Sequence, residues 1–347
     1  MIRFVRLFVL VGALCALAGC VVPPGAIPSV ISNEASATGE AAAASAVAPV
    51  AAPADPSACR TIGHDMGETQ VCGTPTKVVV LGPHMLDILL SLGLQAAGFA
   101  ETSQINEEEF GKPVGAIAYL EPYVTELPIN VGSREEPNLE VLTLLKPDLI
   151  LSELRDEDQL ALLQQIAPTL AYRGNRTAEW QRTIVPIATA LNIPAEADRV
   201  IDEYAAFLAE KRAELAPIIA AHPRLIFMPR NQDGRITIFT PKSWAGDLLV
   251  NLGFELVYVA DGEEVDTEAS VEIMPTFNTD TIIVGASGTT TPAIAQEMWT
   301  SNAVLSALPA SQAGRVHFVD YQLWSRVRGP IAARLVTEEL ISLLAQP

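Results

Sequence analysis

The sequence predicts an α/β protein built from two similar lobes that one long helix joins, with a ligand cleft between the lobes. The first observation is a repeated phrase, because DILLSLG at 87–93 returns as DLLVNLG at 247–253. The second is an alternation of apolar, strand-like runs with helical patterns, which is typical of largely parallel α/β sheets. The third is a long helical pattern over 195–221, between the two copies. Two lobes of one plan enclose a cleft, and small ligands bind in clefts.

The repeat extends beyond this phrase. Each copy follows an apolar strand candidate and a proline, and each leads into another apolar run. A second pair agrees with it, since Glu140 and Glu272 each stand eight residues before an aspartate that opens an apolar run, Asp148 and Asp280. Because the order and the spacing of both pairs match, we interpret them as two lobes of one design rather than as chance resemblance.

The N-terminal lobe is predicted to occupy residues 58–193. Its strands are expected at 77–81, 96–100, 148–152 and 169–172, and its helices at 85–92, 139–145, 156–166 and 180–191. Segment 101–137 is rich in Glu, Pro and Gly and has few long apolar runs. We expect it to form loops inserted near the cleft.

The connecting helix is predicted at 194–222. Apolar residues recur at helical spacing between Pro194 and Pro223, and Pro217 is expected to kink the last turn. At a rise of 1.5 Å per residue this helix reaches roughly 40 Å, which suits a spine between two lobes.

The C-terminal lobe is predicted at 223–347 and repeats the theme. Its strands are expected at 225–228, 235–240, 256–259, 281–284 and 316–319, and its helices at 244–252, 292–300 and 330–344.

Residues 1–19 have the pattern of a signal peptide. Arg3 and Arg6 precede an apolar run at 7–18, which is too short for a confident membrane span. The run ends in Leu-Ala-Gly before Cys20, which resembles a bacterial lipobox and implies cleavage before Cys20 and lipidation of its thiol. A plain secretory signal is the alternative.

Residues 20–57 are predicted to be a lipidated cysteine followed by a flexible tether. The segment consists largely of Ala, Pro, Ser and Val, and such a composition buries too little apolar surface to fold. The formal charge of −19 becomes −21 when Arg3 and Arg6 leave with the signal. This acidity argues against a nucleic-acid partner, which requires basic patches.

Besides the lipidated Cys20, the mature chain has two cysteines, Cys59 and Cys72, with Gly63 and Gly67 between them. In an oxidising compartment this spacing indicates a hairpin with a disulfide across its base. A metal site formed by the two cysteines and His64 is the alternative, although a tetrahedral zinc site requires a fourth ligand.

Several motifs resemble one family. They are HDMGET at 64–69, KVVVL at 77–81, PNLE at 137–140, LKPDLIL at 145–151, SWAGDLL at 243–249 and GRVHFVDYQLWS at 314–325. With them, most of residues 58–345 resembles the ABC-transporter substrate-binding proteins that capture ferric siderophores, haem and cobalamin. The resemblance implies two Rossmann-like lobes on one rigid helix that close only slightly. It also implies that Glu140 and Glu272 form salt bridges with arginines of a permease dimer.

Ligand contacts are predicted from the rule that ligands lie beyond the carboxyl ends of the strands. The residues selected in this way, with one aromatic residue from the insertion, are His84, Tyr119, Arg134, Arg173, Arg230, Trp244, Trp324 and Arg326. Arginine offers planar, bidentate donors to carboxylate or catecholate oxygens, which suits an anionic ferric chelate. Because the chelator saturates the iron, we expect no protein metal ligand and no cofactor.

No hydrolase elbow, phosphate-binding loop or HExxH motif occurs in the sequence, so we expect no enzymatic activity. The sequence therefore predicts a monomeric, lipid-anchored extracytoplasmic receptor that delivers a ferric siderophore to an ABC permease dimer with its ATPase. Haem or cobalamin delivery, and a cell-envelope protein without a transport role, are the alternatives.

Overall fold

The computed structural model describes residues 58–101, 110–153, 156–174, 177–230, 236–259 and 264–345. The predicted signal peptide, Cys20 and the tether lie outside these residues. Residues 53–347 form one compact unit, in which two α/β lobes are joined by helix α5 (Pro194–Ala221). Within the described part of the chain, no helix combines the length and the apolar character needed to cross a bilayer.

The N-terminal lobe is built on a five-stranded parallel sheet with the order β5-β4-β3-β6-β7. Its strands are β3 (Val78–Leu81), β4 (Gly98–Glu101), β5 (Ile129–Ser133), β6 (Leu149–Ser152) and β7 (Thr169–Ala171). Every residue of β3, β6 and β7 is buried, as expected for a parallel sheet covered on both faces. Helices α1 (Pro83–Ser91) and α4 (Glu179–Ala190) contribute to the core on one face, and α2 (Leu139–Leu145) and α3 (Glu157–Gln164) to the core on the other.

The C-terminal lobe has a six-stranded sheet, which follows the path β11-β9-β8-β12-β13 with β10 paired to β8. Its strands are β8 (Arg224–Arg230), β9 (Ile236–Phe239), β10 (Glu255–Leu256), β11 (Asp266–Ala269), β12 (Thr281–Ala286) and β13 (Val316–Asp320). Its helices are α6 (Trp244–Leu252), α7 (Pro292–Thr300), α8 (Ala303–Ser306), α9 (Pro309–Gln312) and α10 (Pro330–Leu344), with a 3₁₀ turn η3 (Val271–Thr276) and a π-helical segment η4 (Gln322–Val327).

The two lobes share one plan only in part. Strand β9 pairs antiparallel with β8 and β11, whereas its sequence counterpart β3 has parallel neighbours on both sides. The loops expected over 101–137 also contain β5 and a short 3₁₀ turn, η2 (Glu121–Tyr123). Strand β5 was missed because its sequence, INVGS, is short and includes Gly132 at φ 101°.

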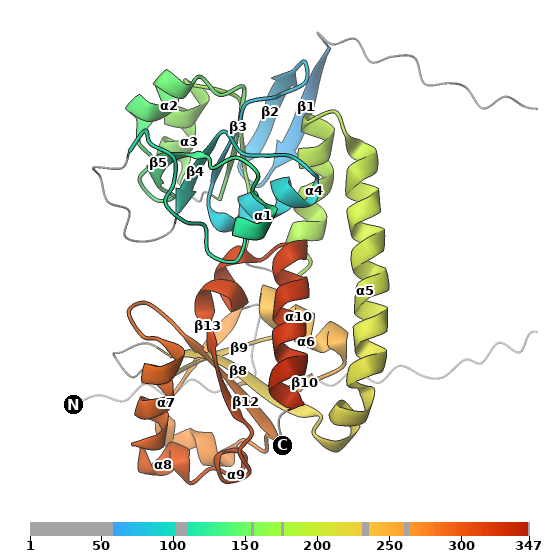
Figure 1. Cartoon of the computed structure of the whole chain (residues 1–347), viewed down its shortest axis with the longest axis vertical. Coiled ribbons are helices and arrows are strands. Elements are labelled where there is room, and N and C mark those ends of the chain that lie inside the picture. The colour runs from blue at the N-terminus through green and yellow to red at the C-terminus, as the bar shows by residue number, and fades with distance from the viewer. Residues whose placement is uncertain are drawn as a thin grey trace, which may run out of the picture. The chain divides into compact units, whose positions relative to one another are not determined.

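Helix α5 lies alongside both lobes and continues past Pro217 to Ala221 (Figure 1). It contacts α4 of the first lobe and α6 and α10 of the second. One apolar cluster contains Leu86 of α1, Tyr204 of α5 and Leu249 of α6, together with one face of each sheet. The lobes therefore share a hydrophobic core.

The repeated phrase has the same local structure in both lobes. Gly93 and Gly253 follow α1 and α6 with φ values of 77° and 113°, a conformation that glycine adopts without steric cost. The N–H of Gly93 donates to Leu90 O at 2.9 Å, and the N–H of Gly253 donates to Val250 O at the same distance.

The aspartate of each repeat accepts hydrogen bonds from the first residues of a helix in the other lobe. Asp87 accepts hydrogen bonds from the backbone of Ile331 at 3.0 Å and of Ala332 at 2.8 Å, at the start of α10. Asp247 accepts one from Ala178 at 3.4 Å, at the start of α4. Burial raises the pKa of Asp87 to about 7, although its backbone hydrogen bonds oppose this rise.

A hairpin of β1 (Cys59–His64) and β2 (Gly67–Cys72) precedes the first sheet, and a disulfide joins Cys59 to Cys72. The backbone N–H of Asp65 at its tip donates to Ala171 O of the edge strand β7 at 3.0 Å. Among the residues described, no group of three or more His, Cys, Asp or Glu side chains is placed to hold a metal ion.

The contact between Asp87 and α10 predicts a strict requirement for glycine at position 329. A Cβ atom there would lie 2.2 Å from Cγ of Asp87, so the Gly329→Ala variant must displace α10 or the carboxylate. We expect the free energy of unfolding, measured by chemical denaturation, to fall by about 2–4 kcal/mol. Gly115→Ala is the control, because an added Cβ there meets no atom within 4 Å. Equal stability of the two variants would contradict a fixed contact.

Candidate functional site

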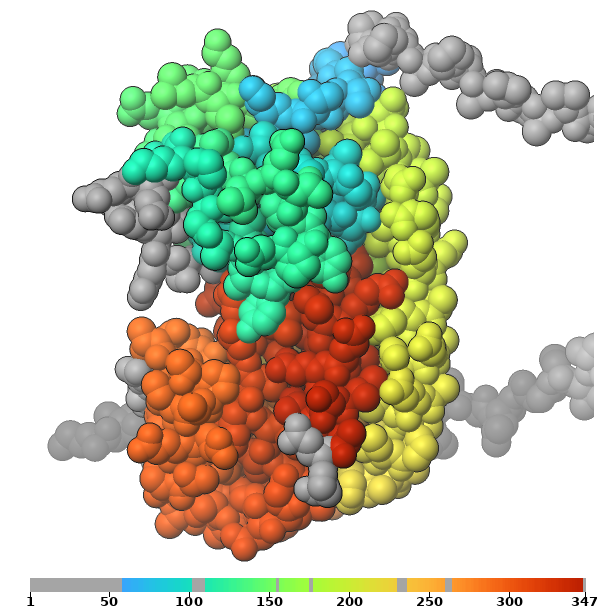
Figure 2. Space-filling view, in the orientation of Figure 1, coloured from blue at the N-terminus to red at the C-terminus, as the bar shows by residue number. Residues whose placement is uncertain are grey.

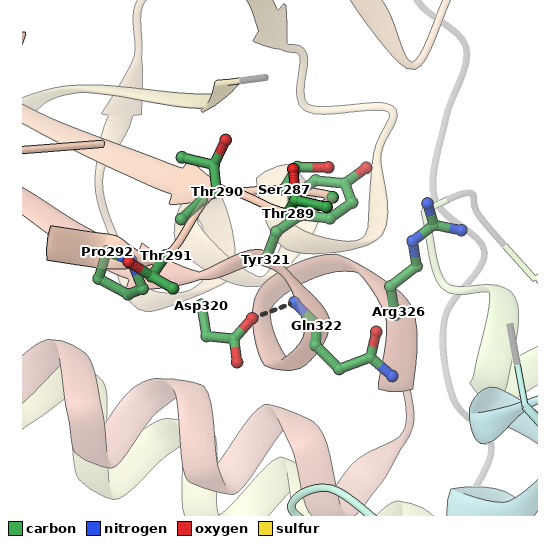
Figure 3. A pocket seen from close by; sticks show the side chains of 11 residues that line it. Ser287, Thr289, Thr290, Thr291, Pro292, Asp320, Tyr321, Gln322 and Arg326 are labelled. Carbon is green, nitrogen blue, oxygen red and sulfur yellow. Dashed lines mark hydrogen bonds between the residues drawn. The ribbon is translucent and has the colours of Figure 1, made fainter. Parts of the chain in front are cut away.

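The candidate site is a cavity of ≈ 460 Å³ at the carboxyl ends of β12 and β13. Figure 3 shows its lining, with threonine and serine side chains along the left and top and Arg326 on the right. The cavity is lined by Ala286, Ser287, Gly288, Thr289, Thr290, Thr291, Pro292, Asp320, Tyr321, Gln322 and Arg326. Its position agrees with the rule that ligands bind beyond the carboxyl ends of parallel strands.

One wall is the loop from β12 into α7. Thr291 caps the helix, and its Oγ1 accepts a hydrogen bond from the N–H of Ile294 at 3.3 Å. Gly288 has φ +67°, which turns the chain back toward the helix. The loop therefore places consecutive hydroxyl side chains beside the positive end of the α7 dipole.

The opposite wall comes from the end of β13 and from η4. The carboxylate of Asp320 accepts the backbone N–H of Gln322 at 2.8 Å, the hydrogen bond drawn in Figure 3. The guanidinium carbon of Arg326 lies 5.5 Å from the centroid of the Tyr321 ring. Among the residues described, no carboxylate forms a salt bridge with Arg326, so its charge remains available to an anion.

The N-terminal lobe reaches this wall at two points. The Tyr119 hydroxyl donates to Oδ2 of Asp320 at 2.5 Å, and the Gln322 amide donates to Glu101 at 3.5 Å. Burial, reinforced by Asp320, raises the pKa of the Tyr119 hydroxyl, so Tyr119 remains a donor at neutral pH. In Figure 2 the surface is hollowed on the left, directly above the orange residues of the C-terminal lobe. The cavity thus lies beside the contact between the lobes.

A buried ion cluster also crosses between the lobes. Glu153 pairs with Arg134 of its own lobe at 2.9 Å and with Arg328 of the other lobe. Burial opposes ionisation of Glu153, but the two guanidinium groups outweigh it and lower its pKa. Arg134 also pairs with Glu135 at 2.5 Å, which leaves its side chain 16% exposed. The charge of Arg134 is therefore already balanced in this structure.

His84 lies beside this cluster and is fully buried. The backbone of Val327 and Arg328 lies close to the ring, but neither ring nitrogen forms a hydrogen bond of normal geometry with a described residue. Burial, together with the nearby charge of Arg328, lowers the pKa of His84 to about 4 despite the opposing effect of Glu153. The imidazole is therefore neutral near pH 7.

Three of the predicted ligand contacts lie in the core instead. His84 and Trp324 are 0% exposed and Trp244 is 4% exposed, so they present almost no surface to a ligand. The indole N–H of Trp324 donates to Oε2 of Glu339 at 2.6 Å. A strand-end position brings a residue near the cleft but does not decide whether its side chain points into the cleft or into the core.

The remaining predicted contacts are dispersed. Arg326 lines the cavity, Tyr119 touches its Asp320 wall, and Arg134 belongs to the ion cluster. Arg173 is exposed, and its backbone N–H donates to Asp65 at 2.9 Å. Arg230 ends β8 opposite Ala286, and its side chain lies outside what the structure describes.

Sequence reasoning missed the hydroxyl loop. None of the residues selected from the sequence lies in the loop at 287–291, although this loop forms most of one cavity wall. The same strand-end rule, applied to β12, would have selected this loop.

The two glutamates expected to dock on a permease are both exposed, one in each lobe. Glu140 lies in the first turn of α2, which Asn138 caps through Val141 N at 3.0 Å. Glu272 lies in η3, where hydrogen bonds from its own backbone N–H and from Ser270 lower its pKa. Glu272 is therefore a carboxylate at neutral pH.

Two α/β lobes on one long helix, with a cavity where their strands end, define a substrate-binding protein of the periplasmic type. The chain belongs to the periplasmic binding protein family, whose sequence pattern matches residues 78–323. This confirms the family resemblance found in the sequence, and members of this family bind substrates rather than act as enzymes.

Two relatives are named for the binding of ferric citrate. The Fe(3+)-citrate-binding protein YfmC of Bacillus subtilis (strain 168) is 31% identical over 275 residues, which cover 78% of this chain and 81% of that protein. The Fe(3+) dicitrate-binding periplasmic protein FecB of Escherichia coli (strain K12) is 24% identical over 82% of this chain and 89% of its own.

Solved structures confirm the fold. Staphylococcus aureus SirA, complexed with staphyloferrin B, superimposes with a TM-score of 0.67 at 24% identity, over 82% of this chain and 98% of that chain.

Burial of His84 predicts a defined loss of stability in acid. Since its pKa falls from 6.5 to about 4 on folding, protons bind the unfolded chain preferentially as the pH drops below 6.5. We expect His84 to account for a loss of about 2 kcal/mol in the free energy of unfolding between pH 7 and pH 5. Chemical denaturation of the wild type and of His84→Gln at both pH values measures this loss as the difference between them. An identical pH dependence would mean that His84 is solvated.

Proposed function

We propose that this protein captures a ferric siderophore or a related ferric chelate outside the cytoplasm and delivers it to the permease of an ABC importer. The observation that carries the proposal is the cavity at the lobe boundary, where Arg326 has no carboxylate partner among the described residues. The 31% identity to a ferric-citrate-binding protein supports the same ligand class.

The chemistry of the cavity suits a saturated iron complex. The chelator supplies all the ligands to iron, so the protein has only to recognise the oxygens on the surface of the complex. A guanidinium gives two parallel donors to such oxygens, and hydroxyl side chains add further donors. The iron chelate is thus cargo, and we propose no cofactor and no catalytic step.

Glu140 and Glu272 are the proposed contacts to the permease dimer. Each carboxylate is exposed on a different lobe, and the shared core holds the two lobes to one another. Two carboxylates at a fixed separation can recognise a matching pair of cations. Delivery then requires little rearrangement between the lobes.

Lipidation of Cys20 is the proposed means of attachment to the membrane, with residues 21–57 as the tether and the folded unit working as a monomer. A relative that is 27% identical over 80% of this chain, YhfQ of Bacillus subtilis (strain 168), is named a putative ABC transporter substrate-binding lipoprotein.

Removing the charge of Arg326 is expected to weaken binding of an anionic ferric chelate. Loss of a charged hydrogen bond costs about 1–3 kcal/mol, so Arg326→Ala should raise Kd roughly 5- to 150-fold in a calorimetric titration. Arg199→Ala is the control, since this arginine pairs with Glu196 and Glu203 on the exposed side of α5. An unchanged Kd for Arg326→Ala would remove this residue from the ligand site.

Removing both glutamates tests whether transport can be lost while binding of the chelate is kept. Glu140→Ala with Glu272→Ala should leave the Kd for the chelate unchanged and lower uptake of ⁵⁵Fe by cells at least tenfold, since both proposed salt bridges are lost. Glu157→Ala is the matched control, because it is also an exposed glutamate in the first turn of a helix. A weaker Kd in the double variant would instead place one of these glutamates at the ligand.

A further inference from the structure

We infer that the cavity takes a ferric chelate of the hydroxycarboxylate class, whose surface presents alcohol and carboxylate oxygens, rather than a catecholate with aromatic rings. This inference rests on the proposed function and narrows the substrate class of the same site. Three features of the cavity carry it: the hydroxyl groups of one wall, the scarcity of free aromatic surface, and one unpaired hydroxyl.

Hydroxyl groups dominate the wall between β12 and α7. Ser287, Thr289, Thr290 and Thr291 are four of the five residues at 287–291, and all line the cavity. An aliphatic hydroxyl both donates and accepts, so it pairs with an alcohol as well as with a carboxylate. Together with Arg326, this wall suits a ligand that carries both alcohol and carboxylate groups.

Aromatic surface is scarce in the same cavity. All four tryptophans are buried in the core, with exposed fractions of 1% for Trp180, 4% for Trp244, 2% for Trp299 and 0% for Trp324.

The single aromatic residue in the lining, Tyr321, is already engaged. Its ring stacks with Phe239 at 6.3 Å and lies next to the guanidinium of Arg326. Catechol rings pack favourably against flat aromatic faces, and the described wall offers little such surface.

Thr290 supplies the most specific observation. It is 5% exposed, and its Oγ1 has no hydrogen-bond partner among the described residues although it belongs to the cavity lining. A buried hydroxyl without a partner destabilises a protein, so such a group calls for an explanation. A ligand oxygen provides one, because rotation about the Cα–Cβ bond of Thr290 would present this hydroxyl to the bound chelate.

Thr290→Val tests this role through two measurements, since the variant should be more stable without ligand and should bind the chelate more weakly. Valine keeps the shape and removes the hydroxyl, so we expect the Tm of the unliganded protein to rise by roughly 2–4 °C. The Kd for ferric citrate, measured by calorimetry on the purified full-length chain, should rise about tenfold. Thr189→Val on α4 is the control, because its hydroxyl already donates to Val185 O at 2.8 Å.

Three iron complexes separate the possible outcomes: ferric citrate, ferric enterobactin as the catecholate and ferrioxamine B as the hydroxamate. We expect ferric citrate to bind at least tenfold more tightly than the other two. Tighter binding of ferric enterobactin or ferrioxamine B would overturn the hydroxycarboxylate class and leave the capture of ferric chelates standing. Binding of none of the three would remove the proposed function itself. An unchanged Kd for ferric citrate in Thr290→Val would overturn the role of the hydroxyl wall.

Discussion

The contact on which the rest of the structure depends is the buried carboxylate of Asp87. It lies in the first helix of one lobe and accepts two backbone hydrogen bonds at the start of α10 in the other. These N–H groups have no partner within their own helix, and the dipole favours a negative charge at that end. Asp247 makes a weaker version of the same contact in the opposite direction. The two lobes are therefore joined by α5, by a shared apolar core and by carboxylates that cross between them.

This arrangement explains the position of the candidate site. The residues that follow β13 first contribute Asp320, Gln322 and Arg326 to the cavity, and then lead through Arg328 and Gly329 into α10. The helix that Asp87 caps is thus continuous with one wall of the cavity. Arg328 is engaged by Glu153, whereas Arg326 is left to the cavity. Among the described residues near the boundary, Arg134 and Arg328 pair with carboxylates, whereas Arg326 presents its positive charge to the cavity.

The sequence predicted the helices better than the site. Residues 139–145, 244–252, 292–300 and 330–344 are helical with the predicted bounds, because apolar spacing and capping residues act locally. The antiparallel pairing of β9 was not predicted, since it depends on strands distant in the chain. Trp244 and Trp324 were placed at the ligand because they follow strands, and only the packing of both lobes shows them in the core. The hydroxyl loop was missed because threonine and serine are also ordinary turn residues.

The disulfide at the start of the folded unit has a mechanical consequence. A pulling force on the chain before Cys59 is transmitted through the disulfide to Cys72 and then to β3. The residues between the two cysteines therefore do not bear this force. The hairpin that they form covers the edge of β7 through the contact of Asp65 with Ala171. A pull on the proposed anchor would therefore leave this edge covered, and the candidate cavity, which the other lobe lines, would not bear the load.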